Sequence, residues 1–181
     1  MGQYYTPIIL GDNAHVRLTK HEYIRLFLSA HDYNNGMKLM EHSYLKNNFV
    51  SAFEYLISPE GPYHMSRVVW AGDYADNEPD SEQNLYGIAL SGQQGNQPHP
   101  ESKDTPSYRY IVNHTKGLYV DKNHLEHNIH PLPLLTAEGN GRGGGDYTGQ
   151  NSELCGTWAR DLLSVETACP QGYTELHCDF D

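Results

Sequence analysis

Glycines cluster around one arginine and one aspartate between residues 139 and 149, which read GNGRGGGDYTG. Glycine has no Cβ, so its backbone amides approach a ligand closely and form concave nests that bind anions. Arg142 can grip a phosphate or carboxylate through two parallel hydrogen bonds, and Asp146 can accept from sugar hydroxyls or bind a cation. The segment is neither a Walker loop nor a GxGxxG fingerprint, and its alternative is a plain connection between strands. The predicted ligand-contact residues are Arg142, Gly143, Gly144, Gly145, Asp146 and Tyr147.

Both tryptophans of the chain begin the same short pattern, Trp-Ala-x-Asp, at residues 70–73 and 158–161. The repetition suggests a divergent internal duplication in which two similar units share one sheet, although two core tryptophans can converge on the same pattern. We expect residues 67–73 and 157–166 to be strands of that sheet with both indoles buried. Asp73 and Asp161 are then a candidate functional pair that takes ligand hydroxyls or a cation.

His42 follows Glu41 among polar residues, directly before a predicted helix. A histidine beside a carboxylate can act as a general base near neutral pH. If the ligand is hydrolysed, His42 is the candidate catalytic residue; the alternative is a solvated side chain without a role. The chain contains no Gly-x-Ser-x-Gly nucleophile elbow.

His124, His127 and His130 are spaced by three residues, which invites a metal-site hypothesis. Successive rings at that spacing point in different directions on a helix, and no cysteine lies near them. We therefore predict solvated loop histidines, with no metal site and no cofactor. The three cysteines are scattered, which favours free thiols in a reducing compartment and a cytoplasmic protein.

The chain of 181 residues has the length of one domain and a formal net charge of −11. That charge repels a nucleic-acid backbone, so a nucleic-acid partner is not expected. No secretory signal or membrane-spanning apolar run is present, so no membrane partner is expected either. Composition leaves the oligomeric state open.

The hydrophobic patterning predicts an α+β fold with a twisted, mostly antiparallel sheet and N-terminal helices on one of its faces. A Thr-x-x-Glu capping box at Thr19 predicts a helix over 20–30, and an apolar stripe predicts another over 46–58. The predicted strands cover 3–10, 67–73, the hairpin 108–121, 131–137 and 157–166. Residues 77–106 are predicted to be a long surface loop, and residues 167–181 a loosely attached C-terminal extension.

MGQYY at the start, GMKLMEHS at 36–43, AGDYAD at 71–76, YIVN at 110–113 and GNGRGGGDY together resemble a family of uncharacterised bacterial and phage proteins. The resemblance covers nearly the whole chain and implies one shared site for the polar motifs, with no activity attached. It also suggests a phage protein that removes a host signalling nucleotide. We expect the chain to bind a small phosphorylated, nucleotide-like ligand, with hydrolysis and simple sequestration of that ligand as the two alternatives. The alternative is an acidic interaction protein that inhibits a host protein by direct binding.

Overall fold

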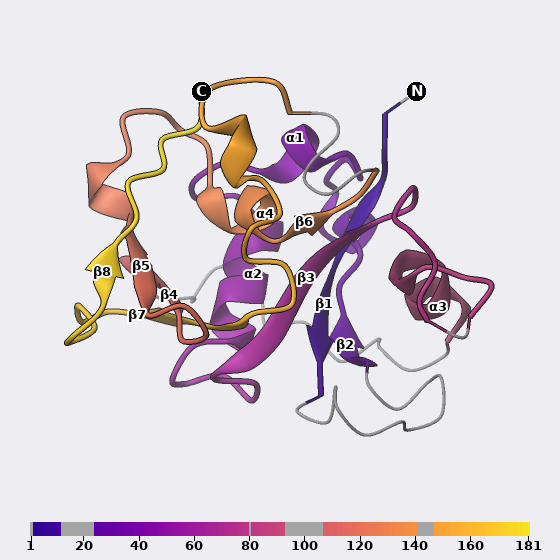
Figure 1. Cartoon of the computed structure of the whole chain (residues 1–181), viewed down its shortest axis with the longest axis horizontal. Coiled ribbons are helices and arrows are strands. Elements are labelled where there is room, and N and C mark those ends of the chain that lie inside the picture. The colour runs from indigo at the N-terminus through magenta and orange to yellow at the C-terminus, as the bar shows by residue number, and fades with distance from the viewer. Residues whose placement is uncertain (1, 12–23, 80, 93–106, 141–146) are drawn as a thin grey trace.

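The computed structural model describes residues 2–11, 24–79, 81–92, 107–140 and 147–181 (Figure 1). Within these residues, eight strands form one mostly antiparallel sheet, accompanied by four α-helices, which confirms the predicted α+β fold. The strand order is β2-β1-β3-β7-β4-β5-β8, and β6 pairs with β3 off this path.

The strands are β1 Tyr5–Leu10, β2 Ile24–Phe27, β3 Ser66–Gly72, β4 Tyr110–Asn113, β5 Leu118–Asp121, β6 Ala137–Glu138, β7 Leu162–Glu166 and β8 Thr174–Glu175. The α-helices are α1 Leu39–His42, α2 Asn48–Leu56, α3 Leu85–Ser91 and α4 Pro131–Leu135. The 3₁₀ turns in the described parts of the chain are η1 Ala30–Tyr33, η3 Lys122–His124 and η4 Ser152–Leu154.

The longest pairing in the sheet is the antiparallel one of β1 with β3, with a register from Tyr5 opposite Gly72 to Leu10 opposite Arg67. The predicted hairpin is confirmed as β4 and β5, and β7 pairs with both β3 and β4. The predicted helix over 46–58 is confirmed as α2, whose first turn is capped by the Asn47 side chain accepting from the amides of Phe49 and Val50.

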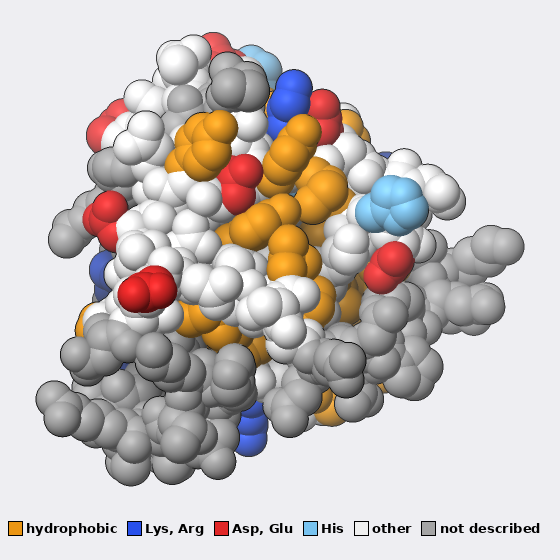
Figure 2. All heavy atoms as spheres, turned by 90° about the vertical axis from the view of Figure 1, so that its right-hand side faces the viewer, with side chains coloured by type: hydrophobic (Ala, Val, Ile, Leu, Met, Phe, Trp, Pro, Cys, Tyr) orange, Lys and Arg blue, Asp and Glu red, His pale blue; other side chains and the backbone are white. Residues whose placement is uncertain are grey.

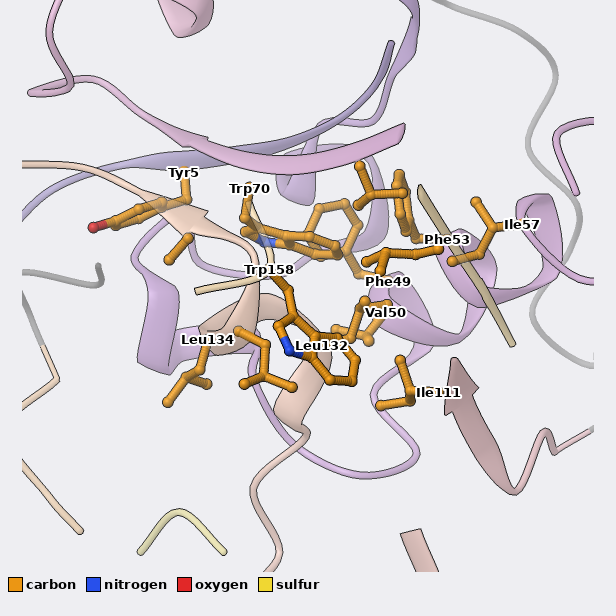
Figure 3. Packing of buried hydrophobic residues seen from close by; sticks show 14 of the residues in the cluster. Tyr5, Phe49, Val50, Phe53, Ile57, Trp70, Ile111, Leu132, Leu134 and Trp158 are labelled. Carbon is orange, nitrogen blue, oxygen red and sulfur yellow. The ribbon is translucent and has the colours of Figure 1, made fainter. Parts of the chain in front are cut away.

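The main core lies between one face of the sheet and helices α2 and α4 (Figure 3). Trp70 and Trp158 are both buried in it, at 0% and 1% exposure, as predicted. Phe53 of α2 packs edge-on against the Trp70 indole at 4.9 Å between ring centroids. The backbone amide of Trp70 donates to Thr136 O, and that of Trp158 donates to Leu135 O. The end of α4 therefore positions the backbone of both tryptophans.

A second, smaller apolar cluster lies on the other face of the sheet, where Ile8, Val69 and Ala71 pack against Leu85 and Ile88 of α3. The helices therefore do not all cover one face: α2 packs on one side and α3 on the other (Figure 1). Helix α3 also interrupts residues 77–106, which were predicted to be loop.

Three other predictions of local structure are wrong. The helix predicted over 20–30 is contradicted at residues 24–27, which form β2 because pairing with β1 buries Ile24 and Leu26. Most of 131–137 is α4, since Pro131 occupies a first-turn position and the His130 side chain caps the helix. Residues 158–161 are a turn, with Arg160 at φ 66°, so the two Trp-Ala-x-Asp copies have different backbones and do not support a duplication.

The C-terminal segment is part of the core and is not loosely attached. Cys178 and Phe180 are buried at 2% and 1% exposure, and the Phe180 ring packs against Tyr147. No helix among the described residues is long and apolar enough to cross a membrane.

Candidate ligand-binding site

The glycine-rich segment begins and ends within the described residues, whereas its centre lies outside them. Gly139, Asn140 and residues 147–149 are described. The predicted contacts Arg142, Gly143, Gly144, Gly145 and Asp146 lie outside the described residues. The site is therefore built from the two flanks of the segment and from what those flanks contact.

The N-terminal flank is attached to the first strand. The Asn140 amide donates to Gln3 Oε1 at 3.1 Å, and the Tyr5 hydroxyl donates to the same oxygen at 3.3 Å. Gly72 lies directly beneath, where a Cβ would approach Glu138 O and Tyr5 Cε1 at 3.0 Å. This close backbone approach favours glycine, because a Cβ would need its neighbours to shift by a few tenths of an ångström.

Arg160 reinforces the same flank from a different segment. Its guanidinium bonds Glu138 Oε2 through Nε at 2.8 Å and Glu78 Oε2 through Nη1 at 3.0 Å. Burial lowers the pKa of Arg160, but the hydrogen bonds and charges of both carboxylates outweigh it and raise that pKa. Sequence reasoning missed this residue, because only the folded chain brings Glu78 and Glu138 to it.

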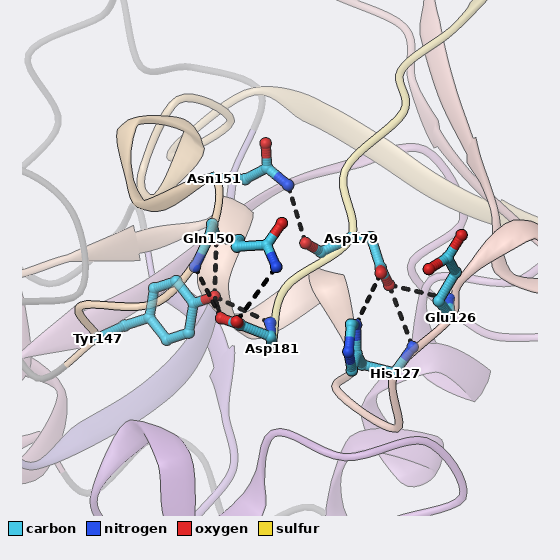
Figure 4. A network of polar contacts seen from close by, with 7 residues as sticks. All are labelled: Glu126, His127, Tyr147, Gln150, Asn151, Asp179 and Asp181. Carbon is cyan, nitrogen blue, oxygen red and sulfur yellow. Dashed lines mark hydrogen bonds and ion pairs between the residues drawn. The ribbon is translucent and has the colours of Figure 1, made fainter.

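The C-terminal flank is attached to the end of the chain. Tyr147 is buried, its hydroxyl donates to Gln150 O at 2.6 Å, and it accepts from the Asp181 amide at 3.0 Å (Figure 4). Burial raises the pKa of the Tyr147 phenol. The ring points into the protein and not toward solvent, so Tyr147 anchors the segment and does not offer a stacking surface.

Asp73 lies at the end of β3, beside the N-terminal flank. Its Oδ1 accepts from the Tyr4 amide at 3.0 Å, and its own amide donates to Tyr4 O at 3.0 Å, which continues the β1–β3 ladder. The Asn84 side chain donates to Asp73 O at 2.9 Å and fixes the backbone. The second carboxylate oxygen, Oδ2, accepts no hydrogen bond from the part of the chain that the structure describes.

Tyrosines surround Asp73. Tyr4 and Tyr74, its chain neighbour, are 45% and 48% exposed. Tyr86 is half-buried, and its pKa is raised by burial first and then by the charge of Asp73. Exposed aromatic rings can stack on a base, and a carboxylate beside them can accept from a sugar hydroxyl.

Asp161 does not join Asp73. The Val68 amide donates to Asp161 O, which places Asp161 beside a residue five positions before Asp73, or roughly 16 Å away along the strand. The Asp161 carboxylate accepts from Asn113 Nδ2 at 2.8 Å and pairs with Lys116 Nζ. Its partners are those of a structural residue at the β4–β7 end of the sheet, so the expected functional pair is not brought together.

His42 is fully buried, and both of its ring nitrogens are engaged. Nδ1 lies 3.0 Å from Gly36 O, and Nε2 accepts from the Trp70 indole at 2.9 Å. These partners define the neutral tautomer with the proton on Nδ1, and burial lowers the pKa of the ring. The remaining lone pair is used inside the core, so the geometry gives no support to His42 as a general base.

The three histidines at 124, 127 and 130 point to different partners. His124 and His127 bond carboxylates of the C-terminal segment, whereas His130 is buried against Glu54. Across the described residues, no group of three or more histidine, cysteine, aspartate or glutamate side chains is arranged to hold a metal ion. The sequence does not predict the contacts of His124 and His127, because their partners, Glu175 and Asp179, lie about fifty residues further along the chain.

Comparison with known proteins gives no relative: no protein-family profile, curated protein or solved structure matches the chain.

Proposed function

We propose that the chain binds a small phosphorylated, nucleotide-like ligand where the start of β1 lies beside the end of β3 and the glycine-rich segment is attached. One observation carries the proposal. The N-terminal flank of that segment, at Asn140, is bonded to Gln3, next to the Asp73 carboxylate and the exposed rings of Tyr4 and Tyr74. A ligand held there meets an acceptor and two aromatic faces at once.

The division of roles follows from chemistry. Arg142 and the amides of Gly143–Gly145 would hold the anion, since a guanidinium binds a phosphate in two places and glycine amides approach it closely. Asp73 and Asp146 would accept ribose hydroxyls or a cation, and the exposed tyrosines would stack on the base. Because His42 has no free lone pair, we propose binding and not hydrolysis. The resemblance to phage proteins suggests sequestration of a host signalling nucleotide.

The proposal is tested by a thermal-shift panel of mono-, di- and cyclic nucleotides, followed by calorimetric titration with whichever nucleotide raises the melting temperature. Arg142→Ala should weaken binding by about thirty- to a thousandfold, the loss of a two-pronged contact with a phosphate. Asp73→Asn should weaken it less. Arg25→Ala is the matched control: Arg25 is exposed on β2, which pairs with the opposite end of β1, and its loss should leave affinity unchanged.

Unchanged affinity in Arg142→Ala would remove the glycine-rich segment from the site. A flat panel would remove the nucleotide proposal altogether.

The second candidate is an interaction protein that inhibits its partner by direct binding. Hydrophobic side chains form a band on the face that carries α3, with single acidic side chains beside it (Figure 2). Leu90 of α3 is 48% exposed, and the formal net charge is −11. An apolar surface with acidic surroundings fits a basic protein partner. A flat nucleotide panel combined with loss of partner inhibition in Leu90→Asp would favour this candidate.

A further inference from the structure

The last residues of the chain form a strap, residues 174–181, that runs beside β5 and ends at the C-terminal flank of the glycine-rich segment (Figure 1). Its start is a short parallel strand: the Thr174 amide donates to Gly117 O at 3.0 Å, and the Leu176 amide donates to Tyr119 O at 2.7 Å. Two amides of β-type pairing are a weak attachment by themselves, so side chains must supply the rest.

Two histidine–carboxylate pairs connect the strap to the loop that follows β5. His124 Nδ1 lies 2.6 Å from Glu175 Oε1, and His127 Nδ1 lies 2.7 Å from Asp179 Oδ2 (Figure 4). Both histidines belong to the loop and both carboxylates to the strap. The histidine side chains are 53% and 45% exposed, so they exchange protons with solvent.

The strap also holds the flank of the glycine-rich segment. Asp181 Oδ1 accepts from the Gln150 amide at 2.7 Å, and the Asp181 amide donates to the Tyr147 hydroxyl at 3.0 Å. Phe180 packs edge-on against the Tyr147 ring at 5.4 Å. A change at the strap is therefore transmitted directly to Tyr147, the first described residue after the segment.

We propose that the strap is a pH-sensitive fastening: it closes tightly when His124 is protonated, and it opens more often when His124 is neutral, which loosens the Tyr147 flank. A cavity of about 340 Å³ lies between strap and loop, so solvent reaches the pairs. The other groups that face them are Arg109 on β4, Asp121 on β5, Glu126 on the loop and His177 on the strap.

The direction follows from linkage. The hydrogen bond and charge of Glu175 raise the pKa of His124 in the folded protein. The His124–Glu175 pair therefore stabilises the closed strap fully below the ordinary histidine pKa of about 6.5. This stabilisation is lost as the pH rises through the pKa of His124 in the folded protein. Burial raises the pKa of Asp179, but its hydrogen bonds from His127 outweigh burial and lower it, so Asp179 stays ionised throughout this window.

The segment just before the strap responds in the opposite direction. His114 Nδ1 lies 3.0 Å from the Tyr173 hydroxyl, and burial lowers the pKa of His114. The contact between His114 and Tyr173 therefore stabilises the fold above the ordinary histidine pKa, and this stabilisation is lost as the pH falls. Tyr173 stays attached at neutral and higher pH. Opening is thus confined to the strap. It is transient, because opening the strap exposes the buried side chains of Cys178 and Phe180.

Amide hydrogen exchange measured by NMR tests the proposal on the protein alone, without a ligand. Protection factors of the Leu176 and Gln150 amides, corrected for the intrinsic exchange rate, should fall by about two- to fivefold between pH 6 and pH 8, the scale of one exposed ion pair. The Ile111 amide, within the β4–β7 ladder, should not change.

The double variant His124→Gln/His127→Gln should have low, pH-independent protection at Leu176 and Gln150. Glu175→Gln/Asp179→Asn should behave identically, and it serves as the second test if the histidine variant folds poorly. His31→Gln is the matched control, since His31 is an exposed histidine in η1.

Protection at Leu176 that does not change with pH in the wild type, or that falls equally in the double variant, would overturn the fastening. A fall at Leu176 without one at Gln150 would overturn its transmission to Tyr147.

Discussion

Replacing Lys122 with methionine should destabilise the protein severely, although the side chain lies far from the proposed ligand. Glu54 of α2 is buried, with a 5% exposed side chain, and its Oε1 accepts from Lys122 Nζ at 2.6 Å and from His130 Nε2 at 3.0 Å. Methionine keeps the apolar stem of Lys122 but removes the charge. Glu54 is then a buried carboxylate beside a single donor.

That remaining donor is neutral. Burial lowers the pKa of His130, and its Nδ1 accepts from the Leu132 amide at 3.2 Å, so the single proton sits on Nε2. Removing one partner of a buried ion pair costs about 3–5 kcal/mol, a large part of a total stability that is typically 5–15 kcal/mol. In Lys122→Met/Glu54→Gln the amide oxygen still accepts from His130 and no charge is buried, so the cost should fall to about 1–2 kcal/mol.

The assay is urea unfolding at pH 7 and pH 5, followed by tryptophan fluorescence. Burial raises the pKa of Glu54, but the hydrogen bonds from His130 and Lys122 and the positive charge of Lys122 outweigh it, so the wild-type pKa is lowered. Without Lys122, burial dominates and raises it. The variant can then protonate Glu54 at pH 5, and its deficit should shrink there.

Lys38→Met is the matched control, because Lys38 also pairs with a glutamate but is 46% exposed, and its loss should cost no more than about 0.5 kcal/mol. A deficit for Lys122→Met below about 1 kcal/mol, or one equal at both pH values, would refute the reasoning.

Two further predictions concern the tryptophan core. Acrylamide should quench native fluorescence weakly, because Trp70 and Trp158 are both buried, and strong quenching of both indoles would contradict the packing. His42→Leu should cost about 1–3 kcal/mol, since the Trp70 indole loses its buried acceptor. Burial lowers the pKa of His42, so its contribution is present above about pH 6.5 and lost as the pH falls. His42→Leu should therefore lose less stability than the wild type between pH 7 and pH 5 in the same urea assay.

The parts of the fold that the sequence predicts are those decided locally. β1, β3 and the β4–β5 hairpin are β-branched or aromatic runs bounded by turn residues, and α2 has one apolar stripe behind an asparagine cap. Each of these signals lies within about ten residues of the element that it specifies. The burial of both tryptophans was predictable for the same reason, since a large apolar ring has few alternatives in a small domain.

The wrong predictions concern segments whose structure depends on residues far away in the sequence. Residues 24–27 carry a helical pattern, yet pairing with β1 makes them a strand. In 131–137, alternation of proline and leucine suggested a strand, and the cap by His130 with Pro131 in the first turn was overlooked. Asp73 and Asp161 looked equivalent in their four-residue context, but the register of β3 against its neighbours separates them.

The difference between local signals and long-range contacts also explains which part of the candidate site could be predicted from the sequence. The type and spacing of residues 139–149 point to a ligand on chemical grounds, whereas the groups next to the segment depend on the β1–β3 register, which places Tyr4 opposite Asp73. His42 shows the converse: a residue chosen for its chemistry becomes structural once Trp70 occupies its lone pair. A titratable side chain can act as a general base only if the fold leaves it within hydrogen-bond reach of a substrate.

The two flanks of the glycine-rich segment differ in how firmly they are held. The Asn140 flank rests on Gln3 and Tyr5 of the sheet centre, with Gly72 packed beneath and no group that titrates near neutral pH among these contacts. The Tyr147 flank rests on the strap, whose attachment includes two half-exposed histidine pairs. One flank is therefore a fixed reference, and the other has a free energy of opening that changes with proton concentration. In such an arrangement pH changes how firmly Tyr147 is attached to the strap, and it leaves Asp73 and its tyrosines in place.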